Sequence, residues 1–297
     1  MKVLVVGLLG EGSGKTILAS SLVSVLRKEG INAVGFKPVG GTEVWLHPEV
    51  LEESTSRGTL VTSDALLIER ASGKPYPIEV YNPIGFHIMP LDPASFNWSL
   101  KSFMRLSASL AHRVSLGRIS TCVDGRAESV HFINTSTLSR SPARLSTMML
   151  DVASSLSPRP VKVDARFVER VLEGDHVEAA DRCLKVLEDR HEVVIIESNS
   201  DIAAPTHASL AADIVFAVAP GIVAVVNGRR YSKAVNVSSV SGRPWSVTVE
   251  DAIELTGVQD YVELPLLQDP QEGYSYNDLY PLVEKIKVLG DEDSRAR

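Results

Sequence analysis

Gly7-Leu-Leu-Gly-Glu-Gly-Ser-Gly-Lys-Thr16 is the stretch that decides the fold of this chain. It directly follows the apolar run Val3-Leu-Val-Val6 and directly precedes a segment with helical spacing. Glycines in a loop of this kind let consecutive backbone N–H groups turn toward phosphate oxygens at the start of a helix. The order strand, glycine-rich loop, helix therefore predicts a phosphate-binding loop at the edge of an α/β sheet.

The polar residues of the loop have separate expected tasks. Lys15 supplies a mobile cation for the phosphates of a nucleoside triphosphate, and Thr16 offers a hydroxyl to Mg²⁺. The residues expected to contact the nucleotide are Gly10, Glu11, Gly12, Ser13, Gly14, Lys15 and Thr16. The spacing is irregular, because the usual pattern needs a glycine where this chain has Leu9. A glycine-rich turn without a ligand is the alternative, and the flanking strand and helix argue against it.

Length and composition indicate a folded globular protein. A chain of 297 residues fits one elaborated α/β domain, or a domain with a large insertion. Hydrophobic residues make up 44% and charged residues 23%, which excludes wholesale disorder. No apolar run approaches the roughly 20 residues of a membrane span. The N-terminus leads straight into the loop, so we expect no membrane contact and a cytoplasmic location.

The two cysteines and the charge pattern narrow the choice of partners. Cys122 and Cys183 are far apart and lack metal-ligand spacing, so we expect neither a disulfide nor a zinc site. A net charge of −7 argues against nucleic acid as a partner. Residues 101–145 are basic, with only Asp124 and Glu128 as acids. This segment either meets an anionic substrate, a phosphate or an acidic partner, or it is a solvated surface.

The rest of the chain alternates between strand-like and helix-like segments. We expect strands at 2–6, 33–36, 193–196, 213–218 and 258–264, and helices at 15–29, 63–71 and 179–189. Such alternation predicts an α/β P-loop NTPase fold, in which a mostly parallel sheet carries helices on both faces.

One region interrupts this alternation. In residues 85–165, Asp124-Gly125 predicts a β-hairpin, and 143–156 has helical spacing. We therefore expect a nucleotide-binding core at 1–84 and 166–290, an inserted hairpin-and-helix subdomain or lid at 85–165, and a frayed tail at 291–297.

Several segments resemble those of dethiobiotin synthetase and its relatives among the P-loop NTPases. In chain order they are Gly35-Phe-Lys-Pro-Val39, Thr62-Ser-Asp-Ala-Leu66, Tyr81-Asn-Pro83, Val193-Val-Ile-Ile-Glu197 and Glu263-Leu-Pro265. The resemblance covers residues 1–93 and 190–267 and leaves the insertion unmatched. It implies a homodimer.

The resemblance also implies a Mg²⁺-dependent ATP site. Thr16, Asp64 and Glu197 would surround the metal, while Lys15 and Lys37 would approach the phosphates and the carboxylate of an acceptor. Hard Mg²⁺ prefers oxygen ligands, and one hydroxyl with two carboxylates suits it. Two lysines beside the γ-phosphate would supply the charge neutralisation that phosphoryl transfer needs.

Two residues are expected near the base of the nucleotide. The segment ending at Pro265 corresponds to the one by which the family contacts the base, and Asn227 is the nearby amide with a plausible role. The sequence contains no guanine-recognition motif, so ATP is favoured over GTP.

Departures from the family pattern indicate a divergent relative rather than a dethiobiotin synthetase. The family places Gly-Ala-Gly-Gly after the metal glutamate, where this chain has Ser198-Asn-Ser-Asp201, and Leu9-Gly-Glu11 replaces its Thr-Asp-Thr run. The leading interpretation is an ATP-dependent, ligase-like or phosphoryl-transfer enzyme that activates a carboxylate or carbamate of a small anionic acceptor, with Lys15 and Lys37 as catalytic residues. The alternative is a regulatory or assembly ATPase or GTPase that acts on a protein partner through the inserted hairpin.

Overall fold

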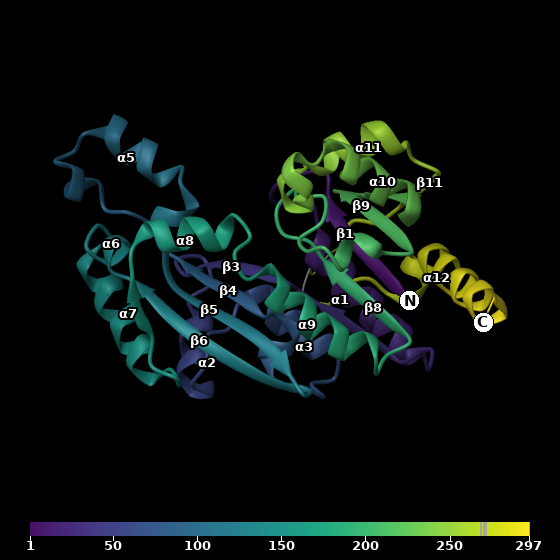
Figure 1. Ribbon diagram of the computed structural model, residues 1–297, viewed down its shortest axis with the longest axis horizontal. Coiled ribbons are helices and arrows are strands. Elements are labelled where there is room, and N and C mark those ends of the chain that lie inside the picture. Colours follow the sequence, from purple (N-terminus) through teal and green to yellow (C-terminus); the bar gives the residue numbers. More distant parts are fainter. Residues whose placement is uncertain (268, 270–271, 297) are drawn as a thin grey trace.

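The computed structural model describes residues 1–267, 269 and 272–296, which form an α/β fold with two mixed β-sheets (Figure 1). The six-stranded sheet has the order β11-β10-β9-β1-β8-β2. Its strands are β1 (Lys2–Gly7), β2 (Ala33–Phe36), β8 (Val193–Glu197), β9 (Ile214–Ala219), β10 (Ile222–Asn227) and β11 (Asp260–Glu263). Strands therefore form in each of the five segments where the sequence predicted one.

The first sheet is mixed, because β10 departs from the expected parallel arrangement. β8 and β9 flank β1 in parallel, and β2 is parallel to β8. β10, however, is antiparallel to both β9 and β11. Pro220 and Gly221 form the two-residue turn between β9 and β10, and Gly221 has φ 79°. A left-handed glycine in so short a turn favours an antiparallel return of the chain.

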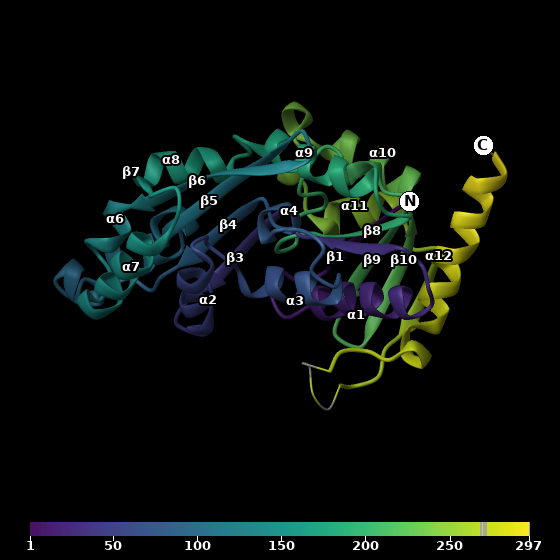
Figure 2. The ribbon, with the colours of Figure 1, turned by 90° about the horizontal axis from the view of Figure 1, so that it is seen from below.

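Helices cover both faces of this sheet. α1 (Lys15–Lys28) and α3 (Ser63–Ala71) lie on one face, and α9 (Val177–Glu188), α10 (Gly228–Ser238) and α11 (Val249–Thr256) lie on the other (Figure 2). The buried apolar side chains of α1 include those that the helical spacing selected, Leu18, Leu22, Val23, Val25 and Leu26. The sheet is thus enclosed, which explains why its central strands are continuous apolar runs.

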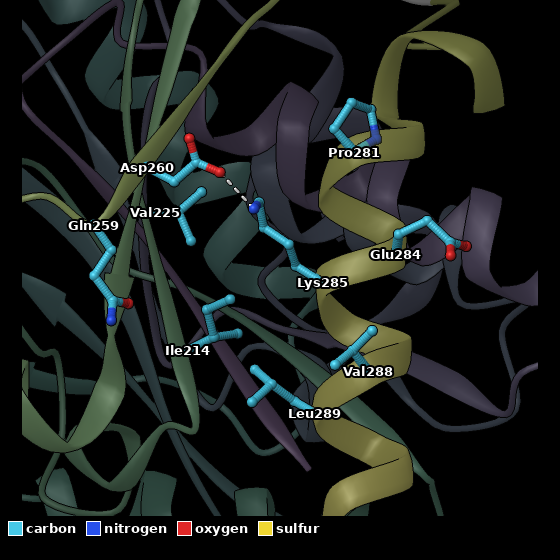
Figure 3. Close-up of a pocket in the computed structure, with 9 residues that line it drawn as sticks. All are labelled: Ile214, Val225, Gln259, Asp260, Pro281, Glu284, Lys285, Val288 and Leu289. Carbon is cyan, nitrogen blue, oxygen red and sulfur yellow. Dashed lines mark hydrogen bonds and ion pairs between the residues drawn. The ribbon is translucent and has the colours of Figure 1, made fainter.

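The C-terminal helix α12 (Tyr276–Ala296) packs beside the antiparallel side of the sheet. Lys285 Nζ lies 2.6 Å from Asp260 Oδ2 at the start of β11, and a cavity of about 500 Å³ lies next to this ion pair (Figure 3). The expected tail at 291–297 overlaps the end of this helix, and Arg297 lies outside the described residues.

The second sheet has the order β3-β4-β5-β6-β7 and contains the expected hairpin. Its strands are β3 (Val39–Glu43), β4 (Ile84–Ile88), β5 (Val114–Val123), β6 (Arg126–Asn134) and β7 (Val161–Val163). Asp124 (φ 48°) and Gly125 (φ 76°) form the two-residue turn between β5 and β6, which agrees with the prediction.

The second sheet packs with the first around one hydrophobic cluster. β3 begins two residues after Lys37, and the expected boundary at residue 85 falls within β4. Phe86 and Phe132 of this sheet belong to the same buried cluster as β1 and β8. Most of the remaining helices cover the second sheet and its edges, namely α2 (Glu49–Arg57), α4 (Ile78–Tyr81), α6 (Thr135–Leu138), α7 (Ala143–Ser155) and α8 (Ala165–Leu172). α5 (Leu100–Ser107) packs instead against the short helices Pro93–Phe96 and Leu110–His112.

A disulfide joins Cys122 of β5 to Cys183 of α9, with the two Cα atoms 4.9 Å apart. The expectation of no disulfide was wrong, because spacing along the chain does not show that α9 packs against β5. Disulfides are rare in reducing compartments, so this bond gives no support to the expected cytoplasmic location. In the described part of the chain, no helix is both long and apolar enough to cross a bilayer.

Reduction of this disulfide should destabilise the protein. The bond closes a loop with a sequence separation of 61 residues. Loop-closure entropy of that size corresponds to roughly 4 kcal/mol of unfolding free energy. Urea unfolding with and without reductant measures the difference, and a Cys122→Ala variant should not respond to reductant. Superimposable curves for the wild-type protein would show that the bond does not form in solution.

Candidate nucleotide-binding site

The glycine-rich loop connects β1 to α1 as the sequence predicted. Gly12 (φ 69°) and Gly14 (φ 90°) adopt left-handed conformations, and Gly14 caps the start of α1. Lys15 Nζ donates a hydrogen bond to Ser13 Oγ over 3.1 Å. A Cβ atom on Gly7 would lie 2.6 Å from Lys15 Nζ and 2.9 Å from the backbone oxygen of Leu9, so a side chain here would displace the ammonium group and the loop. The lysine thus folds back over the loop, where a phosphate would need a positive charge.

The expected metal ligands gather beside the loop. Thr16 Oγ1 donates to Glu197 Oε1 over 2.6 Å, and Lys37 Nζ donates to the same oxygen, also over 2.6 Å. Lys37 Nζ lies 3.3 Å from Asp64 Oδ2. Thr16, Lys37, Asp64 and Glu197 therefore form one connected cluster, which we call the carboxylate–lysine cluster.

The parallel strands explain why these residues meet. Thr16 is in the first turn of α1 after β1, Lys37 directly follows β2, and Glu197 is the last residue of β8. The carboxyl ends of β1, β2 and β8 lie at the same edge of the sheet, which is where open α/β folds bind their ligands. Asp64 reaches the cluster from the first turn of α3.

The carboxylate–lysine cluster is buried and strongly charged. Glu197 is 0% exposed and Lys37 is 3% exposed. Burial lowers the pKa of Lys37, but Glu197 and Asp64 outweigh this effect and hold the pKa above its ordinary value. Burial and the nearby Lys37 lower the pKa of Lys15. The ammonium of Lys37 therefore stays charged and offsets part of the negative charge of the two carboxylates beside it.

The oxygen atoms of the cluster suit Mg²⁺. Glu197 Oε2 is buried and has no hydrogen-bond partner in the described residues, so one carboxylate oxygen is left for a further ligand. The Asp64 side chain is 31% exposed and faces the same ammonium. The described residues contain no group of three or more His, Cys, Asp or Glu residues that would hold a metal by themselves. A magnesium ion here would depend on two carboxylates, the Thr16 hydroxyl, phosphate and water, which is the usual pattern for this ion.

Asn82 positions Lys37, a role that sequence reasoning missed. Lys37 N donates to Tyr81 O over 2.7 Å, and Asn82 Nδ2 donates to Lys37 O over 2.8 Å. Thr62 Oγ1 in turn donates to the buried Asn82 Oδ1 over 3.1 Å. In the sequence, the segment Tyr81-Asn-Pro83 stands out only by its resemblance to the family. The positioning role of Asn82 could have been inferred from its place, because an amide side chain here lies between an apolar helix and an apolar strand.

The two residues expected near the base lie at opposite edges of the sheet. Pro265 follows β11, and Leu264 N donates to Gly221 O over 2.9 Å, which places this segment beside the carboxyl end of β9 and on the side of the loop. Asn227 pairs with Ile214, the first residue of β9, and so lies at the far edge. Its side chain caps α10 by accepting from Arg230 N over 3.0 Å. The structure does not bring Asn227 to the loop, because β10 runs antiparallel to β9.

The loop after Glu197 approaches the glycine-rich loop. A Cβ atom on Gly10 would lie 3.4 Å from Ser200 Oγ, and Ser200 has φ 48°. Glu11, the next residue along the loop, is exposed. The segment Ser198-Asn-Ser-Asp201, which departs from the family pattern, is therefore next to the expected phosphate position.

Neither the family models nor the curated proteins compared with this chain give a match. The likeness to dethiobiotin synthetase thus stays an expectation that depends on the quoted segments, and the function is argued below from the site itself.

Proposed function

We propose that this protein is a Mg²⁺-dependent P-loop enzyme that binds and hydrolyses ATP and uses it to activate a carboxylate or carbamate of a small anionic acceptor. The observation that carries the proposal is the carboxylate–lysine cluster. Its four residues are far apart in the sequence, and Thr16 and Glu197 are separated by 181 positions. All four nevertheless lie together beside the glycine-rich loop. A buried arrangement of two carboxylates and a lysine has little use in a simple glycine turn.

The residues of the chain would divide the chemistry among them. The backbone amides of residues 10–15 would bind the phosphate oxygens, and Lys15 would neutralise their charge. Thr16, Asp64 and Glu197 would hold Mg²⁺, which supplies charge neutralisation on the phosphates when bound. Lys37 would orient the anionic acceptor, because Glu197 holds its ammonium at the carboxyl edge of the sheet and Asn82 fixes its backbone carbonyl.

A second candidate is a regulatory or assembly ATPase or GTPase that acts on a protein partner. One observation favours it. The three donors of the Lys37 ammonium already face Glu197 Oε1, Asp64 Oδ2 and Ser198 O. An acceptor would have to displace one of these contacts, whereas a switch would need no free donor on Lys37.

Replacement of Lys37 separates the two candidates. In Lys37→Ala we expect acceptor-stimulated ATP turnover to fall by roughly 100-fold, since a preorganised charged donor is lost. The measurement is ATP hydrolysis alone and with small carboxylates, or with amines and bicarbonate. Lys162→Ala, which removes an exposed lysine from β7, is the matched control and should keep full stimulation. If no acceptor stimulates the wild type and Lys37→Ala keeps basal turnover, the second candidate is correct.

A further inference from the structure

The basic segment 101–145 has no part in the proposed nucleotide site, and the structure assigns several of its arginines to the framework. Arg118 is 0% exposed and donates to the backbone carbonyls of Leu60 and Asn82. Arg113 pairs with Glu43 at the end of β3. These two guanidinium groups therefore already have partners within the fold.

Arg105 and Arg140 are different, because they line one pocket together. The pocket has a volume of about 560 Å³ and lies between α5, the short helix Pro93–Phe96, the short helix Leu110–His112 and the residues after α6. His112 also lines it, and no acidic residue does. In the described part of the chain, neither guanidinium has an ion-pair partner. Two arginines that share a pocket repel each other unless an anion lies between them.

The remaining walls of the pocket suggest the shape of its ligand. Ser95, Ser102 and Ser109 contribute hydroxyl groups, and Phe96 and Leu106 contribute apolar surface. Ser95 Oγ donates to Asp92 O over 2.7 Å and also contacts Arg140 O at 3.3 Å. Asp92 N donates to Arg140 O over 2.7 Å, so the pocket wall is fixed by backbone contacts. The Asp92 carboxylate itself accepts from Ala94 N and is occupied as a cap.

This pocket is remote from the glycine-rich loop. α5 and α6 lie at one end of the molecule in Figure 1, while α1 lies nearer the middle, and Figure 2 likewise separates α6 from α1, which lies beneath the six-stranded sheet. A ligand in the pocket would thus not contact a nucleotide bound at the loop.

We propose that the pocket lined by Arg105 and Arg140 binds a small organic anion, whose carboxylate or phosphate group meets the two guanidinium groups and whose apolar part meets Phe96 and Leu106. Guanidinium groups bind both oxyanions through paired, charge-assisted hydrogen bonds. The hydroxyls of Ser102 and Ser109 can donate to the remaining oxygen atoms.

Calorimetric titration with phenyl phosphate and with benzoate tests this proposal. The titrations use the full chain carrying Lys15→Ala, so that the glycine-rich loop does not compete for the probe. We expect saturable binding of at least one probe, and the tighter one identifies the head group. Adding Arg105→Ala and Arg140→Ala should weaken binding by at least about tenfold, the factor that corresponds to about 1.4 kcal/mol.

The matched control adds Lys101→Ala and Arg144→Ala instead, which remove the same charge from α5 and α7 outside the pocket. All four side chains are exposed, so both double variants should keep the thermal stability of the parent protein. The affinity of the control variant for each probe should lie within about twofold of that of the parent protein. Equal weakening in both double variants, or no saturable binding of either probe to the parent protein, would overturn the proposal.

Discussion

Lys15→Ala should reduce ATP hydrolysis by at least about 100-fold, as expected for loss of a preorganised cation that faces developing negative charge. The Lys15 ammonium lies over Gly7 and bonds to Ser13 Oγ, so its position is fixed before a ligand arrives. Its lowered pKa reflects burial and the neighbouring Lys37, and the charge of a triphosphate would oppose both effects. Equilibrium binding of a fluorescent ATP analogue and steady-state hydrolysis give the two measurements.

Lys28→Ala is the control for this prediction. Lys28 is exposed in the last turn of the same helix α1, so its loss changes the net charge without touching the loop. Its activity should match the wild type. Unchanged ATP hydrolysis in Lys15→Ala would contradict the proposal that the glycine-rich loop binds the nucleotide.

Glu197→Leu should lower the free energy of unfolding by roughly 3–5 kcal/mol, the cost of leaving a buried charge without its partner. Lys37 is 3% exposed, and Glu197 Oε1 is its shortest contact at 2.6 Å. Asp64 is further away and partly exposed, so it compensates only in part. Urea unfolding followed by circular dichroism measures the change.

The double variant Lys37→Met with Glu197→Leu provides the control for that loss. Removing both charges leaves an apolar pair of similar size, which is often neutral for stability. We therefore expect the double variant to recover most of the stability that Glu197→Leu loses. A double variant less stable than the single one would mean that Glu197 stabilises the fold by something other than its pairing with Lys37. Both variants should lose Mg²⁺-dependent hydrolysis.

Local signals in the sequence predict the half of the fold that contains the glycine-rich loop. The apolar run before Gly7 and the glycines that follow it specify β1, the loop and α1 without help from distant residues. Asp124-Gly125 specifies the hairpin in the same way. Glu197 stands out because a carboxylate at the end of a buried strand is costly without a partner, and its partners are Thr16 and Lys37.

The sequence-based predictions that were wrong concern contacts between residues far apart in the chain. β10 pairs with two strands at once, and only its direction decides that Asn227 lies at the far edge of the sheet. Pro220-Gly221 was a usable signal for that turn. The bond between Cys122 and Cys183 depends on α9 packing against β5, which no pattern within either segment encodes. Strand pairing depends on the neighbours that tertiary structure provides, so sequence patterns predict that strands exist better than they predict how strands are arranged.

A crystal structure with Mg²⁺ and a non-hydrolysable ATP analogue tests the central claim most directly. We predict that the triphosphate contacts the backbone amides of residues 10–15 and that Mg²⁺ lies roughly 2.0–2.1 Å from Thr16 Oγ1, with Asp64 and Glu197 bound to it directly or through water. A nucleotide bound elsewhere, or a metal ion that neither carboxylate reaches even through water, would contradict it.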